Sequence, residues 1–264
     1  MVWPDRDEQL AQVEHDTPRS LASRTPPLGL GSLAADLPHS DVEDAPYVEL
    51  HLHSCYSLLN GASHVEELAE IAHQRGYRAL ALTDTNGFYG SMEFARECKL
   101  RGIRPITGVE LSVAERDDPE SPRNHLTLLA ENREGYANLC RLISYAHGLL
   151  LDGAEAKDAR RKDPWIAWDA LAEHAAGVIV LTGCPHGRIP SLVVDGEEAE
   201  ACRLLRQLVG WFGPDNVFVE LQDNLVYGDV PRNRALVRLA QAVGLDVVGT
   251  GNVHYHERSR HRLH

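Results

Sequence analysis

The stretch Tyr47-Val48-Glu49-Leu50-His51-Leu52-His53-Ser54-Cys55-Tyr56-Ser57 is the most informative part of this chain. Apolar and polar residues alternate from Val48 to His53, which predicts a strand with His51 and His53 on one face. Two imidazoles at the end of a strand can bind one transition-metal ion, while their other ring nitrogens take supporting partners. With 14 histidines in 264 residues, a lone His-x-His triplet is also expected by chance, as two partly exposed strand residues. The rest of the chain must distinguish these interpretations.

Composition places the chain among ordinary globular proteins. Its 264 residues suit one α/β barrel or two small domains, and 43% hydrophobic with 25% charged residues is typical of soluble folds. No apolar run approaches the ~18–20 residues of a membrane span. The polar N-terminus lacks a signal core, and five cysteines without a Cys-x-x-Cys motif favour a reducing compartment. We therefore expect a cytoplasmic protein without a membrane partner.

The formal net charge of −13 argues against nucleic-acid binding through the general surface, because phosphate contacts require a concentrated basic face. Any role with DNA must then come from a local site or from a further part of a longer protein.

Two segments are predicted to be flexible. Residues 1–45 are interrupted by prolines and have no apolar period, which is typical of a leader rather than a domain. Residues 152–163 form a charged insertion. The folded domain is expected over residues 46–264.

From residue 47 onward, short apolar runs alternate with helical patterns. Seven runs are predicted as strands: residues 48–53, 79–84, 104–113, 125–130, 178–181, 217–221 and 247–249. Helices are predicted from a capping box at Ser63 and Glu66, through Phe94 and Cys98, and over residues 136–150, 169–174, 198–209 and 232–243. The rhythm fits a parallel barrel or an open parallel sheet. Because no Gly-x-Gly-x-x-Gly follows the first strand and no Walker loop occurs, we predict a barrel.

Residues of the types that bind metals follow several of these strands. Barrel enzymes place their chemistry where the carboxyl ends of the strands meet. His125 opens its strand, so it fits this pattern only if that strand runs antiparallel, as a hairpin with residues 104–113 would provide. The expected residues at this end are His51, His53, Asp84, Glu110, His125, Cys184 and His254.

Each of these residues also has a simpler explanation. Asp84 would cap a turn, Glu110 would pair with an arginine, and Cys184 would be a small core residue. Their shared placement nevertheless favours a metal site over seven separate structural roles.

Several motifs, in this order along the chain, resemble those of the polymerase and histidinol phosphatase (PHP) domain. They are His-x-His-Ser-x-Tyr-Ser-x-Leu-x-Gly at 51–61, Ala-Leu-Thr-Asp at 81–84, Gly-Val-Glu at 108–110, His-Leu-Thr-Leu-Leu-Ala at 125–130, Thr-Gly-Cys at 182–184 and Gly-Asn-Val-His-Tyr-His at 251–256. The version resembled begins bacterial DNA polymerase III alpha subunits. Gly-Asn before the last Val-His, and the basic tail at 258–263, are most similar to the error-prone branch.

The resemblance implies a distorted (β/α)7 barrel with up to three metal ions and nine ligand positions. Six positions keep a usual ligand type: His51, His53, Glu110, His125, Cys184 and His254. Three positions are degenerate, with Asn60 and Asn252 in place of aspartate and Thr85 in place of histidine. Because neutral oxygens bind cations less strongly than carboxylates do, we expect one or two zinc or manganese ions at partial occupancy.

The resemblance also implies a function. The polymerases resembled continue past the position of His264 into a palm domain, so we expect an N-terminal part of an error-prone DNA polymerase in replication and damage-tolerant repair. Its barrel would be largely structural and inactive alone. Mg²⁺ and DNA would belong to the polymerase portion, and other replication or translesion proteins would be partners. The alternatives are an active metal-dependent phosphoesterase, either a 3′–5′ exonuclease or a phosphate-monoester hydrolase, and a metal-poor docking scaffold.

Overall fold

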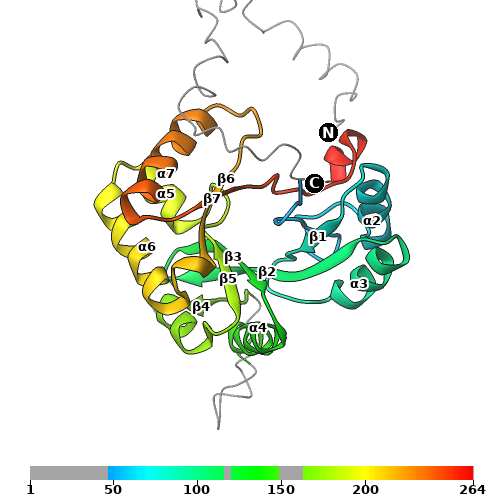
Figure 1. Cartoon of the computed structure of the whole chain (residues 1–264), viewed down its shortest axis with the longest axis horizontal. Coiled ribbons are helices and arrows are strands. Elements are labelled where there is room, and N and C mark those ends of the chain that lie inside the picture. Colours follow the sequence, from blue (N-terminus) through cyan, green and yellow to red (C-terminus); the bar gives the residue numbers. More distant parts are fainter. Residues whose placement is uncertain (1–46, 116–119, 149–162, 264) are drawn as a thin grey trace, which may run out of the picture. The chain divides into compact units, whose positions relative to one another are not determined.

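A curled seven-stranded sheet lies at the centre of the computed structural model, which describes residues 47–115, 120–148 and 163–263 (Figure 1). The predicted leader, residues 1–45, lies outside the described residues. Residues 152–162 of the predicted insertion lie outside them as well. The strands of the described chain are β1 (Ala79–Leu82), β2 (Arg104–Ala114), β3 (Arg123–Ala130), β4 (Ile166–Ala167), β5 (Val178–Leu181), β6 (Val217–Leu221) and β7 (Val247–Gly249).

The sheet has the order β1-β2-β3-β5-β6-β7, and the short strand β4 pairs beside β2. β3 runs antiparallel to both β2 and β5, and the other pairs are parallel. The predicted β2–β3 hairpin is therefore confirmed. This reversal places the beginning of β3 at the same end of the sheet as the carboxyl ends of its neighbours.

The stretch predicted as the first strand is extended but does not form a continuous ladder. Glu49 bridges to Leu80 beside β1, and Leu52 bridges to Val253 beyond β7. The His53 amide donates to the Val253 carbonyl at 2.8 Å. Because this segment divides its backbone hydrogen bonds between the two edges of the sheet, it closes the curled sheet into a distorted barrel. The expected fold class is confirmed.

Helices surround the outside of the sheet (Figure 1). They are α2 (Val65–Gln74), α3 (Ser91–Leu100), α4 (Arg133–Ala146), α5 (Arg188–Val194), α6 (Glu198–Phe212) and α7 (Asp229–Val243), with the short 3-10 helices η2 (Trp168–His174), η3 (Pro214–Asn216) and η4 (Arg258–Leu263). No helix in the described part of the chain combines the length and apolar character needed to span a membrane.

Alternate side chains along each strand pack into two different apolar clusters, one between the sheet and the surrounding helices and one inside the barrel. In β5, Val178 and Val180 face the cluster under the surrounding helices, whereas Ile179 and Leu181 face an inner cluster. The inner cluster also includes Leu129 of β3. A period of two residues sends successive side chains to opposite faces, so every second residue near a strand end points into the barrel.

Several predicted boundaries were wrong. The capping box of α2 uses His64 and Glu67, one residue beyond the predicted pair. α4 covers Arg133–Ala146 rather than residues 136–150. The seven-residue α5 was not predicted, because about two turns that include Pro190 are too short to show a helical period. The two-residue β4 is likewise too short for an alternating pattern.

Candidate metal centre

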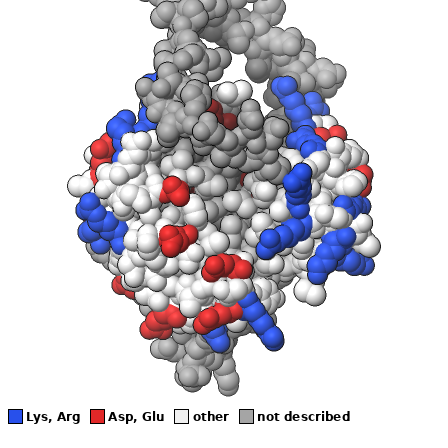
Figure 2. All heavy atoms as spheres, in the orientation of Figure 1, with Lys and Arg blue, Asp and Glu red and all other residues white. Residues whose placement is uncertain are grey.

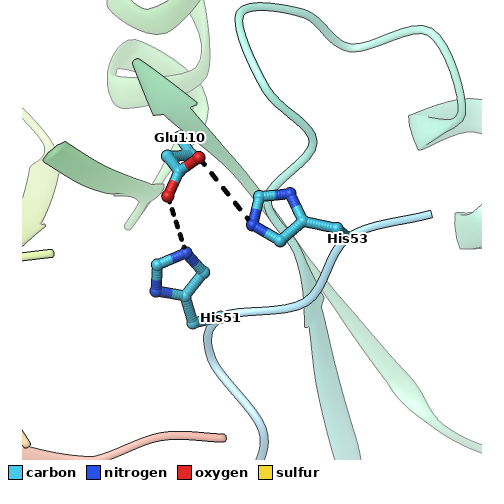
Figure 3. A group of neighbouring side chains, drawn as sticks. All are labelled: His51, His53 and Glu110. Atoms are coloured by element: carbon cyan, nitrogen blue, oxygen red, sulfur yellow. Dashed lines mark hydrogen bonds and ion pairs between the residues drawn. The ribbon is translucent and has the colours of Figure 1, made fainter. Parts of the chain in front are cut away.

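The side chains of His51 and His53 are fully buried and both point toward Glu110 (Figure 3). Their segment is held by backbone hydrogen bonds on both sides, with Val253 donating to the His51 carbonyl at 2.9 Å. The rings lie 5.3 Å apart between centroids. The predicted convergence of the two imidazoles is therefore present, although they come from a bridged extended segment and not from a regular strand.

Glu110 lies between the two imidazoles (Figure 3). Its Oε2 is 3.1 Å from His51 Nε2, and its Oε1 is 3.8 Å from His53 Nε2. Glu110 was expected near the carboxyl end of its strand but lies inside it, because β2 continues to Ala114. β2 pairs with β1 only through Thr107 and then pairs with β3, so Glu110 lies where β2 passes the end of β1.

A second group of ligand-type residues shares Glu110. His125 Nδ1 lies 3.1 Å from Glu110 Oε2 and 3.4 Å from Cys184 Sγ. His125 comes from β3 and Cys184 from the turn after β5. The donor atoms of Glu110, His125 and Cys184 all lie within 4.8 Å of one another, as do those of His51, His53 and Glu110.

His254 completes the set of six predicted ligands. Its ring stacks on that of His53 at 4.9 Å between centroids, with 8° between the planes. Its Nδ1 donates to the Asn60 carbonyl at 3.1 Å, which directs Nε2 elsewhere. All six residues thus lie together at one end of the barrel, drawn from five separate segments.

Two of the three degenerate positions, Asn60 and Thr85, lie beside Glu110. Asn60 Nδ2 lies 3.5 Å from Thr85 Oγ1, which in turn lies 3.5 Å from Glu110 Oε1. Asn252 adopts a left-handed conformation with φ 47°, and its buried Oδ1 has no hydrogen-bond partner. These side chains offer dipoles where carboxylate or imidazole would offer stronger ligands.

Glu220, which the sequence analysis did not single out, supports His51 from the opposite side. This fully buried carboxylate of β6 accepts from His51 Nδ1 at 2.7 Å, from the Gly183 amide and from Gln222 Nε2. The bond leaves His51 Nε2 free to face Glu110. A signal was present, because Glu220 follows Phe218 at a period of two within an otherwise apolar strand.

Asp84 supports His53 through a serine. The sequence placed Asp84 among the ligand-type residues, but it belongs to neither ligand group. Its Oδ1 accepts from Ser57 Oγ at 2.7 Å, and Ser57 Oγ lies 3.2 Å from His53 Nδ1. With Ser57 donating to Asp84, His53 Nδ1 donates to Ser57 and its Nε2 becomes an acceptor.

Burial and the two carboxylates set the protonation of the imidazoles. Burial opposes a charge on His51, but Glu220 and Glu110 raise its pKa to about 10. Burial lowers the pKa of His53 to about 3, with Glu110 opposing the shift. Burial, followed by the charge of Glu110, raises the pKa of the Cys184 thiol above its usual range. Without a metal ion, His51 is a positively charged imidazolium at neutral pH, and His53 is a neutral imidazole.

The donors fit a divalent cation. His53 Nε2 is buried without a hydrogen bond and faces Glu110, an arrangement that a metal ion would complete. Tetrahedral Zn²⁺ with N, O and S ligands places its donor atoms about 3.3–3.8 Å apart. The observed spacings of 3.1–3.8 Å resemble these values. Among the described residues, neither Glu110 nor Glu220 pairs with a lysine or arginine, so a cation would also neutralise buried charge.

Comparison with known proteins gives the same architecture. A solved amidohydrolase from Chromobacterium violaceum matches with a TM-score of 0.55 at 17% identity, over 80% of this chain and 88% of that one. A Bifidobacterium adolescentis structure, named for a metal-dependent phosphoesterase, matches with a TM-score of 0.54 at 15% identity, over 80% and 88% of the two chains. At this identity the two structures establish the fold alone.

Curated relatives are more similar in sequence. An error-prone DNA polymerase of Symbiobacterium thermophilum is 40% identical over 227 residues, 83% of this chain and 20% of the relative. The error-prone DNA polymerase of Mycolicibacterium paratuberculosis is 38% identical over 98% of this chain and 23% of its own length. The DNA polymerase III subunit alpha of Treponema pallidum is 37% identical over 80% and 18%. This chain therefore spans about a fifth of the length of these relatives.

The family model for the PHP domain matches residues 49–224, which include the barrel from its closing segment to the end of β6. The match covers about two thirds of the chain and contains five of the six predicted ligands. This chain therefore belongs to the PHP domain family.

Proposed function

We propose that this chain is the N-terminal PHP domain of an error-prone DNA polymerase that acts in replication and damage-tolerant repair synthesis. The proposal is supported by relatives of that name at about 40% identity over most of the chain. Nucleotidyl transfer with Mg²⁺ would belong to polymerase regions beyond the compared fifth. DNA, together with other replication or translesion proteins in the cytoplasm, would be the partners.

Within that polymerase, we infer that the barrel holds a divalent metal ion as a structural element. The observation that carries this inference is the buried, unbonded Nε2 of His53 facing Glu110. His51 and His53 are each oriented by a buried carboxylate, Glu220 directly and Asp84 through Ser57. Such outer partners fix the tautomer of ligating histidines. The ion would tie the closing segment to β2 across the barrel.

The same site is poorly equipped for phosphodiester hydrolysis. That reaction needs one positive centre to generate a nucleophile and a second to stabilise the leaving oxygen. Asn60 and Thr85 weaken the shared centre next to Glu110, and Asn252 supplies a neutral amide two residues before His254. These neutral groups support the interpretation that the barrel has lost nuclease activity.

Surface charge supports the same conclusion. Acidic side chains lie across the middle of the face in Figure 2, while Lys and Arg gather on the side that carries α2 and α3. The formal net charge of −13 works against attraction of a DNA backbone to the protein as a whole.

The test uses the full 264-residue chain and two measurements, bound metal by mass spectrometry and cleavage of primed DNA with added Zn²⁺ or Mn²⁺. We expect bound metal without cleavage in the natural chain, and less bound metal in His53→Ala than in the natural chain or the exposed control His73→Ala. The combined variant Asn60→Asp, Thr85→His and Asn252→Asp should gain metal. Metal-dependent cleavage by the natural chain, abolished by His53→Ala, would instead establish the phosphoesterase. Absence of bound metal would refute the structural ion.

A further inference from the structure

We propose that His186 is a fourth ligand, which together with Glu110, His125 and Cys184 forms a closed zinc site in this barrel. The inference rests on the proposed metal-binding function and extends it, because it assigns a residue outside the six predicted ligands. It also assigns a metal preference to one of the two ligand groups.

The turn after β5 fixes His186 beside the other three residues. In the sequence Cys184-Pro185-His186-Gly187, the Gly187 amide donates to the Cys184 carbonyl at 2.7 Å. The His186 amide donates to the Cys184 thiol. The His186 carbonyl accepts from the His125 amide at 3.2 Å. The turn therefore ties His186 to both Cys184 and His125.

Two glycines make this close approach possible. Gly183 has φ +91°, and a Cβ there would lie 2.7 Å from the His125 carbonyl oxygen. A Cβ at Gly187 would lie 2.7 Å from the Thr182 carbonyl oxygen. Without side chains at either position, the turn lies directly against the start of β3, where His125 bridges to Gly187.

The His186 ring lies next to the three-donor group. Its centroid is 5.8 Å from that of His125, with 56° between the planes. The side chain is exposed, and among the described residues it makes a ring contact with His125 but no hydrogen bond or ion pair. Rotation of this side chain toward Cys184 would therefore break no described hydrogen bond. The three inner donors are held by the fold, so His186 would approach from the solvent side.

The chemistry of the donors favours zinc. Glu110, His125 and Cys184 offer oxygen, nitrogen and sulfur within 4.8 Å of one another, which leaves one corner of a tetrahedron. A second imidazole at that corner gives a His₂CysGlu set. Thiolate and imidazole bind zinc better than manganese. A site with four protein ligands has no open position for substrate, which is the property of a structural zinc site.

The test uses Co²⁺ as a spectroscopic substitute for zinc in the metal-stripped full chain. Tetrahedral Co²⁺ gives strong visible bands, and a thiolate ligand adds a charge-transfer band in the near ultraviolet. We compare the natural chain with His186→Ala, Cys184→Ser and the control His73→Ala, after checking that unfolding of the metal-free proteins is unchanged for the two exposed histidines.

Loss of the fourth ligand in His186→Ala should weaken Co²⁺ binding at least ~10-fold and reduce the visible bands, while the charge-transfer band remains. Cys184→Ser should remove the charge-transfer band. Bands and affinity in His186→Ala equal to those in His73→Ala would overturn the role of His186, and leave the wider metal proposal intact. Binding without a thiolate band in the natural chain would also overturn it. No Co²⁺ binding at all would refute both proposals.

Discussion

Replacing Glu220 with glutamine tests whether His51 is held in place for a metal ion. Glu220 is fully buried and accepts from His51 Nδ1, the Gly183 amide, Gln222 Nε2 and Thr250 Oγ1. Glutamine has the same shape but offers one acceptor oxygen in place of two. Its NH₂ group would face at least one of these donors, and the negative charge beside His51 would be lost.

The expected magnitude has two parts. In the metal-free protein, Glu220→Gln leaves protonated His51 without its nearest carboxylate, and breaking a buried pair in this way costs about 3–5 kcal/mol of unfolding free energy. In the metal-bound protein, loss of a partner that orients a ligand lowers metal affinity about 10–100-fold. That factor corresponds to about 1.4–2.7 kcal/mol of binding free energy.

Urea unfolding in chelator measures the first part, and zinc titration of the folded protein measures the second. Glu173→Gln, an exposed substitution of the same kind, is the matched control and should change neither value. Zinc affinity equal in Glu220→Gln and the control would refute the idea that Glu220 orients a ligand. An unchanged unfolding free energy in chelator would refute the buried pair itself.

Three further outcomes are expected. Gly135→Ala should lower the melting temperature sharply, because its Cβ would lie 1.6 Å from the Gly177 carbonyl oxygen. Gly210→Ala has open space around it in α6 and should raise the unfolding free energy of the protein by about 0.5–1 kcal/mol; equal effects of the two substitutions would contradict the packing at Gly135. Because the pKa of His51 is about 10 without metal, zinc binding near neutral pH should release at least one proton and weaken as pH falls; calorimetric heats that do not vary with the buffer's ionisation enthalpy would disprove this. Free Zn²⁺ at about 100 times its Kd should raise the unfolding free energy by about 2.7 kcal/mol over chelator-treated protein. His53→Ala should reduce this gain, and an equal gain in His53→Ala would exclude His53 as a ligand.

The sequence determined the elements whose patterns are local. Strands β5, β6 and β7 have the predicted bounds, because each is a short apolar run enclosed between helices. The antiparallel direction of β3 also followed from the sequence, since only that direction brings His125 to the same end of the sheet as Glu110. The His-x-His spacing predicted two inward imidazoles, and that outcome depends only on the period of an extended chain.

The tertiary structure decided which residues meet. The stretch around His51 closes the barrel by dividing its hydrogen bonds between β1 and the segment after β7, and no local pattern specifies partners so distant in sequence. Glu110 lies inside a strand because β2 continues past β1 to pair with β3. Glu220 supports His51 from 169 residues away. A buried carboxylate is stable only beside a partner that offsets its desolvation, and folding alone brings that partner to it.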